Sequence, residues 1–265
     1  MPPTSDQANK VGGMKFAFDA SDAEDAQQAL SELQLHYSTV SSREADVIVV
    51  LGGDGSMLRA LHRYMNSGKM LYGLNRGSIG FLMNEFAVDR LEQRILNAVS
   101  TIIHPLVMEV TLAGNQVERA YALNEVSLLR QSYQAAKLQI SVDDRVRMRE
   151  LICDGILLAT PQGSTAYNLS AHGPILPINA PLLALTPISP FRPRRWRGAL
   201  LPNRARLTID VLDSVMRPVN AVADHTEFKS VEKVVAWEDA GSQCGLLFDP
   251  DHSWDERILA EQFLY

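Results

Sequence analysis

The segment DVIVVLGGDGS, residues 46–56, joins an apolar run to a turn with three glycines and one aspartate. Its first part, Asp46–Leu51, is a near-continuous apolar run rich in β-branched residues, which is typical of a strand buried on both faces. Ser56–Met65 follows with apolar side chains at helical spacing. This strand–turn–helix unit indicates an α/β fold with a parallel sheet.

The same alternation continues on both sides of this segment. Two further strand candidates and two helix candidates are Lys15–Asp19, Met70–Leu74, Ala23–Leu35 and Asp89–Ala98. The alternation predicts a Rossmann-like α/β domain over residues 1–99, with 1–13 as a loose tail. Ligands of such sheets bind at the carboxyl ends of the strands, where both glycine-rich turns, 52–55 and 73–80, fall.

The pattern changes near residue 100. Strand candidates now follow one another with little helical pattern between them: Leu106–Leu112, Gln116–Asn124, Lys137–Val142, Ile152–Ala159, Arg206–Val211 and Lys233–Trp237. They predict an antiparallel, sandwich-like β domain over residues 100–248. The C-terminal segment, 249–265, contains a helix candidate, Trp254–Phe263, and is expected to pack back on the first domain.

Composition and charge exclude several classes of protein. The chain has 265 residues, of which 46% are hydrophobic and 21% charged, as in an ordinary globular protein. Its formal net charge of −6 argues against a nucleic-acid-binding protein. Two cysteines are too few for a disulfide framework, so we expect a reduced, cytoplasmic location. The N-terminus does not resemble a secretory signal, and no apolar run approaches the roughly 18 residues that a membrane span needs.

The first glycine-rich turn offers a phosphate-binding site. Gly52, Gly53 and Gly55 allow the backbone to approach a phosphate closely, and the start of the following helix adds a positive dipole end. There the Asp54 carboxylate could accept a proton from an attacking hydroxyl or help to hold Mg²⁺. The alternative is a plain turn with Asp54 as helix cap. The turn fits neither the P-loop nor GxGxxG, because Leu58 occupies the last glycine position.

A second polar feature interrupts an apolar strand candidate. Asn124 and Glu125 adjoin within ALNEV, residues 122–126, and a strand would direct them to opposite faces. A carboxylate can accept hydrogen bonds from ribose hydroxyls or an adenine amino group, and an amide both donates and accepts. The pair therefore suits a nucleoside, and a strand end that faces solvent is the alternative.

The strongest pattern is DGILLATPQGSTAYNLS, residues 154–170. We expect a strand, a turn of small residues and the start of a helix. Small hydroxyl residues and exposed amides suit a nucleotide, Tyr167 could stack on a base and Asp154 could hold a ribose. A purely structural role is the alternative. Ser164 does not indicate a serine hydrolase, because its surroundings do not fit GxSxG.

Four arginines and two aromatic residues gather in FRPRRWRG, residues 191–198. In isolation this segment is similar to a nucleic-acid patch, but the acidic balance of the chain argues against that interpretation. A subunit contact or a basic rim near an anionic substrate is preferred, and a solvated loop is the alternative. The six histidines include no HExxH motif and no paired ligand spacing, so no zinc site is predicted.

Together the motifs resemble the NAD kinase family. They are GGDG at 52–55, NE at 124–125 and the DG…TPxGSTAYxxS…GPI pattern at 154–175, in the family's order. GGDG is shared with lipid kinases and phosphofructokinase-like enzymes, whereas GSTAYNLS is far more specific. The resemblance spans about residues 45–230. It implies a phosphofructokinase-like α/β domain, a β-rich NAD-binding domain, and phosphoryl transfer from ATP to the 2′-hydroxyl of the adenosine ribose of NAD.

The resemblance also assigns roles to single positions. Asp54 matches the family's proposed general base, and Gly52, Gly53 and Gly55 would bind ATP phosphates. The positions implied to contact NAD are Asp54, Gly55, Arg59, Phe81, Asn124, Glu125, Asp154, Thr165, Ala166, Tyr167, Asn168, Leu169, Ser170 and Asp224. Mg²⁺ or another divalent cation is expected to be held through ATP rather than by a protein site.

Three positions depart from the family pattern. Gln162 stands where a small residue or Thr is usual, His172 replaces a glycine, and His225 follows Asp224 where many members have Gly. These departures leave the donor preference and the second half of the NAD site open. The family further implies a homodimer or homotetramer with sites shared between subunits, and no nucleic-acid or membrane partner. The rival interpretations are a lipid or sugar kinase that shares GGDG, and a module that senses NAD(P) without turnover.

Overall fold

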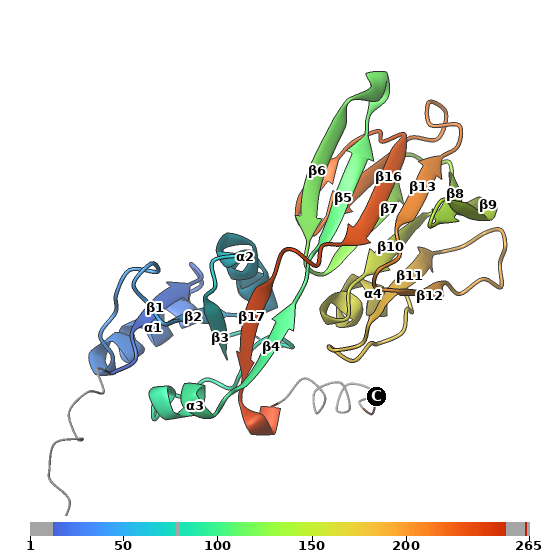
Figure 1. Ribbon diagram of the computed structural model, residues 1–265. Helices are drawn as coiled ribbons and strands as arrows, with labels where there is room; N and C mark the ends of the chain where they lie inside the picture. The colour runs from blue at the N-terminus through green and yellow to red at the C-terminus, as the bar shows by residue number, and fades with distance from the viewer. Residues whose placement is uncertain (1–12, 78–79, 253–262, 264–265) are drawn as a thin grey trace, which may run out of the picture. The chain divides into compact units, whose positions relative to one another are not determined.

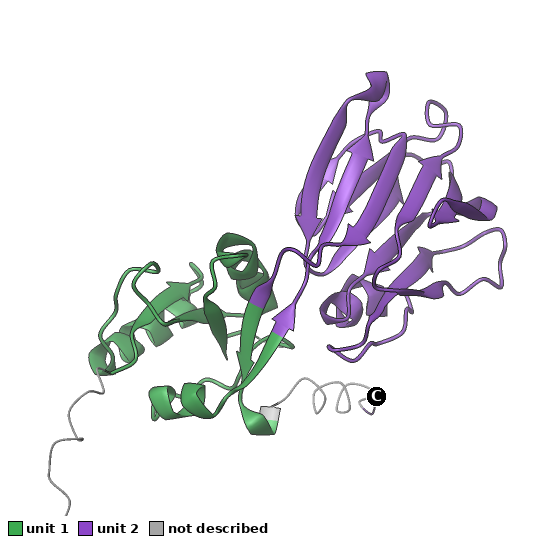
Figure 2. Ribbon diagram, in the orientation of Figure 1, with its two compact units in different colours: residues 1–101, 245–253 green, residues 102–244, 254–265 purple. Residues whose placement is uncertain are grey.

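The protein is described here by a computed structural model that covers residues 13–77, 80–252 and 263 (Figure 1). Its chain forms two compact units (Figure 2). The N-terminal unit comprises residues 1–101 and 245–253, and the C-terminal unit comprises 102–244 and 254–265. The predicted combination of an α/β domain and a domain of antiparallel strands is confirmed.

The N-terminal unit is built on a five-stranded sheet. Its strands, in spatial order, are β1 (Phe16–Ala20), β2 (Val47–Gly52), β3 (Met70–Asn75), β17 (Cys244–Phe248) and β4 (Val99–Ile103). The pairs β1–β2, β2–β3 and β3–β17 are parallel. All six residues of β2 are buried, as its continuous apolar sequence predicts.

Three helices belong to this unit: α1 (Glu24–His36), α2 (Asp54–Tyr64) and α3 (Leu91–Asn97). Their apolar stripes pack on the sheet, where Leu33 and Leu91 join a buried cluster with Val49 and Tyr72. α2 begins at Asp54, two residues earlier than the pattern predicts, because Gly53 adopts an extended conformation as N-cap. No helix among the described residues is long and apolar enough to cross a bilayer.

The strand β17 shows where the sequence-based boundary differs from the structure. The sequence analysis included residues 244–248 in the β-rich domain, whereas the structure pairs them with β3 in the N-terminal sheet. All five residues of β17 are buried. The sequence of a fully buried apolar strand does not indicate with which sheet the strand will pair. The segment then continues through a short 3₁₀ turn, Pro250–His252, and the helix candidate Trp254–Phe263 falls almost entirely outside the described residues.

The C-terminal unit consists of two six-stranded sheets in which all paired strands are antiparallel. One sheet has the order β6 (Val117–Ala122), β5 (Leu106–Thr111), β16 (Lys233–Glu238), β13 (Leu207–Val211), β8 (Ala136–Val142) and β9 (Arg145–Cys153). The other has the order β12 (Ala199–Pro202), β11 (Leu182–Ile188), β10 (Gly155–Ala159), β7 (Glu125–Arg130), β14 (Val219–Ala223) and β15 (Thr226–Phe228). One buried cluster contains side chains of both sheets, among them Met108 and Leu128.

The predicted strand Ile152–Ala159 is divided between the two sheets. Its first two residues end β9, and its last five form β10 in the other sheet. Asp154 lies at the crossover, where its backbone N–H donates to the Ile188 carbonyl. The sequence analysis did not predict β7, β11 or β14, which surround the candidate site together with the short helices Gln162–Thr165 (η2) and Tyr167–Ser170 (α4).

Candidate active site

A polar cavity of about 680 Å³ lies at the carboxyl ends of β1, β2 and β3. Its lining contains Asp19, Ala20, Ser21, Asp22, Ala23, Gly52, Gly53, Ser56, Arg59, Ala60, Arg63, Arg76 and Gly77. The 11-residue helix α2 begins at this cavity, so the positive end of its dipole lies there. The position agrees with the general rule that parallel sheets bind ligands at the carboxyl edge.

Three arginines make this cavity suited to a polyanion. Arg63 forms an ion pair with Asp19 at 2.7 Å, and Arg76 donates to a carbonyl in the first turn of α1. Arg59 donates to the Ser56 hydroxyl at 3.2 Å. The sequence analysis named Arg59 but missed Arg63 and Arg76, although Arg76 stands in the second glycine-rich turn. Guanidinium groups together with a helix N-terminus bind phosphate oxygens well.

Gly52 has a conformation that a larger residue would strain. Its φ is +152°, and a Cβ atom at this position would lie 2.3 Å from the Ser56 hydroxyl oxygen. Nearby, a Cβ on Gly77 would lie 3.4 Å from the Cα of Gly53. The two glycine-rich turns therefore lie against each other at the floor of the cavity.

The Asp54 carboxylate lies at the start of α2 and is held by the segment after β3. Its two oxygens accept backbone N–H groups from Phe81 and Leu82, each at 2.8 Å. Two predicted site residues, Asp54 and Phe81, are thus in direct contact.

The second group of predicted residues lies in the C-terminal unit around the start of β7. The Asp224 carboxylate accepts the backbone N–H groups of Leu123, Asn124 and Glu125 at 2.7, 3.0 and 3.3 Å. Asp224 occupies the tight turn between β14 and β15 with a φ of +51°. The structure therefore brings Asn124, Glu125 and Asp224 together, and Asp224 fixes the backbone of the other two.

Glu125 is a partly buried acid with an uncompensated oxygen. Its Oε2 atom is inaccessible to solvent and has no hydrogen-bond partner among the residues that the structure describes. Burial, and then the nearby Asp224 charge, raises the pKa of Glu125 to about 8. The pKa of the Tyr167 hydroxyl is also raised, by burial and by Glu125. Glu125, Asp224 and Tyr167 therefore interact in one electrostatic environment.

The small-residue turn of the strongest motif packs on the backbone before β7. The Thr160 hydroxyl and the Gln162 amide both donate to the Leu123 carbonyl, at 2.6 and 2.7 Å. A Cβ atom on Gly163 would lie 2.1 Å from the Asn124 carbonyl oxygen, so only glycine fits there. The departure at position 162 thus has a structural consequence, because the longer Gln side chain supplies an additional bond to Leu123.

Asn168 has its side chain fully inside the protein. Its amide nitrogen donates to the carbonyls of Ser164 and Pro174 at 3.0 and 2.9 Å, and its oxygen accepts the Thr186 hydroxyl at 2.7 Å. Its side chain is 0% exposed, and Ser164 is equally buried. The predicted contact of Asn168 with NAD stays untested, and what the structure gives this side chain is a role in shaping the turn. The other predicted residues of the turn are partly or fully exposed: Thr165, Ala166, Tyr167, Leu169 and Ser170.

Asp154 lies apart from this group. Its carboxylate accepts Arg130 Nε at 2.6 Å, at the end of β7 opposite to Glu125. β10 pairs with β7 so that Ala159, not Asp154, faces Glu125. Five residues of strand correspond to roughly 17 Å at about 3.4 Å per residue. Within one chain, the structure does not bring Asp154 to Glu125.

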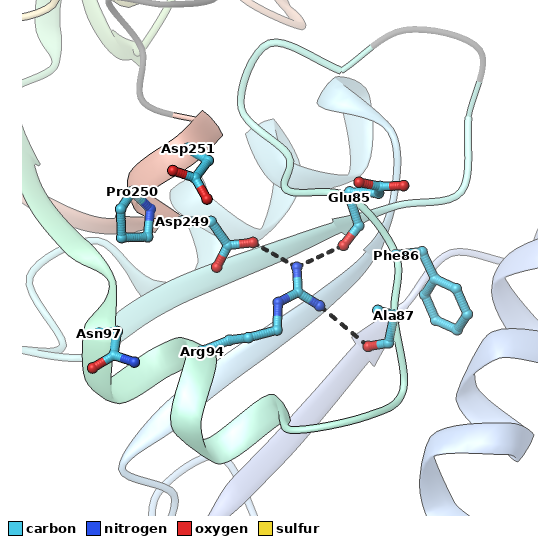
Figure 3. A pocket seen from close by; sticks show the side chains of 8 residues that line it. All are labelled: Glu85, Phe86, Ala87, Arg94, Asn97, Asp249, Pro250 and Asp251. Atoms are coloured by element: carbon cyan, nitrogen blue, oxygen red, sulfur yellow. Dashed lines mark hydrogen bonds and ion pairs between the residues drawn. The ribbon is translucent and has the colours of Figure 1, made fainter.

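A separate cavity of about 520 Å³ in the N-terminal unit is organised by Arg94 (Figure 3). The guanidinium donates to the carbonyls of Glu85 and Ala87 and forms an ion pair with Asp249 at 2.6 Å. The other oxygen of Asp249 accepts the Tyr72 hydroxyl at 2.6 Å. These bonds tie the segment after β17 to α3 and β3, and we interpret the cluster as structural.

Comparison with known proteins identifies the family. The model of the ATP-NAD kinase N-terminal domain matches residues 5–106, and that of the ATP-NAD kinase C-terminal domain matches residues 123–232. An NAD kinase of Rhizobium meliloti (strain 1021) is 60% identical over 248 residues, which cover 94% of this chain and 96% of the relative. An NAD kinase of Brucella suis biovar 1 is 56% identical over 254 residues, covering 96% and 99%.

Solved structures agree in fold. Yeast NADH kinase complexed with NADH superposes with a TM-score of 0.80 at 21% identity, covering 95% of this chain and 87% of that one. An NAD kinase from Archaeoglobus fulgidus in complex with ATP gives a TM-score of 0.73 at 21% identity, covering 95% and 100%. The resemblance inferred from the motifs is confirmed: the chain belongs to the ATP-NAD kinase family.

Proposed function

We propose that this protein, an NAD kinase by family, transfers the γ-phosphoryl group of ATP to the 2′-hydroxyl of the adenosine ribose of NAD, with Asp54 as the general base. The position of Asp54 is the observation that supports its role as the base. Its carboxylate lies at the N-terminus of α2, beside a cavity lined by Arg59 and Arg76. A base next to a polyanion site is what phosphoryl transfer to an alcohol needs.

In this mechanism the ATP phosphates occupy the cavity at the carboxyl ends of β1, β2 and β3. Asp54 accepts the proton of the 2′-hydroxyl while that oxygen forms a bond to the γ-phosphorus, and the bond from the phosphorus to the bridging oxygen of ADP breaks. The hydrogen bonds from Phe81 and Leu82 orient the carboxylate before the reaction. Positioning and charge neutralisation supply most of the rate enhancement in reactions of this kind.

The divalent cation belongs to this proposal as well. Mg²⁺ neutralises the charge of the transferred phosphoryl group and prefers phosphate oxygens, water and one or two carboxylates as ligands. Among the residues that the structure describes, no group of three His, Cys, Asp or Glu side chains could enclose a cation. A cation bound by the ATP phosphates would fit this cavity, whose lining contains two carboxylates, Asp19 and Asp22.

NAD is proposed to bind at the start of β7 and at the η2–α4 turn. Asn124 and Glu125 offer an amide and a carboxyl group to ribose hydroxyls or adenine nitrogens. Tyr167 offers an aromatic face to a base. The position of Asp154 beside Arg130, at the other end of β7, supports a shared site in which Asp154 acts on the NAD of a neighbouring subunit of a dimer or tetramer.

A cytoplasmic location completes the proposal. Cys153 and Cys244 are both buried free thiols, and burial raises the pKa of each to about 12. Thiols of this kind are unreactive and fit a reducing compartment.

The test is an assay of product formation. Purified protein is incubated with NAD, ATP and Mg²⁺, and NADP is measured with an NADP-specific dehydrogenase, with Asp54→Asn as the comparison. We expect wild-type protein to form NADP and the variant to lose roughly 10² to 10⁴-fold in kcat while it retains NAD binding. Near-normal turnover in Asp54→Asn would remove Asp54 from the mechanism.

Absence of NADP formation by wild-type protein would have one of two explanations. If folded protein forms no NADP from ATP, inorganic polyphosphate is the next donor to test. If it binds NAD and turns over with neither donor, the protein is a sensing module rather than a kinase. A lipid or sugar kinase is disfavoured by the family assignment and by the complete GSTAYNLS motif.

A further inference from the structure

Glu125 and Asp224, the carboxyl pair at the start of β7, lie in opposite environments. Three backbone N–H groups point at Asp224, and their dipoles stabilise negative charge there. Glu125 has no such support, because its inaccessible Oε2 atom lacks a hydrogen-bond partner within residues 13–77, 80–252 and 263. Two adjacent carboxyl groups in a poorly solvated site do not readily ionise together. The geometry therefore divides the pair into a charged member, Asp224, and a neutral member, Glu125.

Residues of β10, of α4 and of the β14–β15 turn lie near Glu125. On β10 the residue facing Glu125 is Ala159, and in the turn after β14 the backbone N–H of Asp224 donates to the Glu125 carbonyl. α4 contributes Tyr167, and a charge on Glu125 opposes the ionisation of the Tyr167 hydroxyl, whose pKa is raised. The nearby charge that raises the pKa of Glu125 is that of Asp224, which precedes His225 in the β14–β15 turn.

We propose that Glu125 binds NAD as a neutral carboxylic acid and donates its O–H to an acceptor atom of the substrate, while Asp224 carries the negative charge of the pair. The inference rests on the proposed function, in which Glu125 contacts NAD. It agrees with a pKa of about 8 for Glu125, which leaves the group neutral at pH 7. Ribose hydroxyl oxygens and adenine ring nitrogens are acceptors that a carboxylic acid can serve.

The protonation state decides which hydrogen bond can form. A neutral carboxyl has one O–H donor, whereas a carboxylate is an acceptor only. Ionised Glu125 would turn acceptor lone pairs toward an acceptor of the substrate, and the contact would become repulsive. NAD affinity should therefore fall as the pH rises above about 8, and the decrease should approach about tenfold per pH unit.

The experiment measures NAD binding by isothermal titration calorimetry between pH 6.5 and 9.5, without ATP. Wild-type protein should lose affinity above pH 8 and take up a proton on binding NAD at pH 8.5, which buffers of different ionisation enthalpy reveal. Glu125→Gln replaces the O–H donor of the neutral acid by an N–H donor and keeps its shape. It should bind NAD within a few-fold of wild type at pH 7, with neither the high-pH loss nor the proton uptake.

Asp154→Asn is the matched control, because it removes another predicted NAD-contacting carboxylate that is 42% exposed and bonded to Arg130. Any change in affinity should be a constant factor across the pH range, so the pH profile should keep the wild-type shape. Tyr167→Phe should keep the profile too, which separates Glu125 from the neighbouring hydroxyl.

Two results would overturn the inference. One is proton release when wild-type protein binds NAD at pH 7, because this means that the carboxylate is the binding form. The other is a pH profile of Glu125→Gln that still falls like that of wild type. Both leave the kinase function intact. Failure of folded wild-type protein to bind NAD or form NADP at any pH would instead contradict the proposed function.

Discussion

Gly163 lies so close to Asn124 that a Cβ atom added to Gly163 would stand 2.1 Å from the Asn124 carbonyl oxygen. The contact is backbone against backbone, so no side-chain movement can relieve it. Gly163→Ala should therefore displace the η2 turn from the start of β7. We expect a loss of at least about 2 kcal/mol in the free energy of unfolding, measured by urea denaturation, together with weaker NAD binding.

Gly13→Ala serves as the control for this substitution, because a Cβ at Gly13 would have no described atom within 4 Å. It should leave both measurements unchanged. A Gly163→Ala protein with wild-type stability and NAD affinity would mean that the turn does not need this close approach.

Asp224 is expected to act on NAD binding by holding the 123–125 backbone. Asp224→Asn replaces one acceptor oxygen by an N–H₂ group that cannot receive the N–H groups of Leu123, Asn124 and Glu125 equally well. A buried N–H left without a partner costs about 1–3 kcal/mol. The variant should have a lower thermal midpoint and a higher Kd for NAD, both measurable by calorimetry. Weakened NAD binding with an unchanged thermal midpoint would instead indicate that Asp224 contacts the substrate directly.

Glu125 should make stability depend on pH. Its pKa is raised from 4.5 to about 8 in the folded state, so the folded protein binds the proton more tightly than the unfolded chain does. The stability that this proton contributes is fully present below pH 4.5 and is lost as the pH rises toward 8. The Gln side chain of Glu125→Gln does not titrate, so this variant should not lose stability in this way as the pH rises. We expect it to match wild type at pH 5 and to exceed it by roughly 4 kcal/mol at pH 8.5 in denaturant unfolding.

The outcome that contradicts this prediction is a constant difference in unfolding free energy between wild type and Glu125→Gln at the two pH values. In that case Glu125 would be ionised throughout, and the assignment of the proton within the carboxyl pair would be wrong as well.

Arg94 should contribute more to stability than an exposed arginine does. The side chains of the Arg94–Asp249 pair are 20% and 13% exposed, so Arg94→Met leaves a poorly solvated carboxylate without its cation. Breaking such a pair costs about 3 kcal/mol. In the Arg119–Glu109 pair, Arg119 is 67% exposed, and Arg119→Met should cost less than about 1 kcal/mol. Equal costs in urea denaturation would show that burial of the Arg94 cluster adds nothing.

Local patterns identified the first half of the fold well. β2 and α2 were predicted from DVIVVL and from the helical spacing after GGDG, because a buried parallel strand and an amphipathic helix each have a distinctive sequence period. The β-rich second half was predicted as a class, but β7, β11 and β14 were missed. Continuous apolar runs such as β10 and β17 look alike in sequence whichever sheet receives them.

The sequence by itself determined the family, the class of fold and the types of residue in the site, because the motifs GGDG, NE and GSTAYNLS can be recognised from the sequence alone. Only the tertiary structure decided how these residues act on one another. The Asp224 bonds to residues 123–125 span about a hundred positions, and the crossover of the chain at Asp154 from β9 to β10 depends on how the two sheets pair their strands. Hydrogen bonds and burial between distant segments leave no periodic trace in a chain, because they arise only when the strands pair and exclude water.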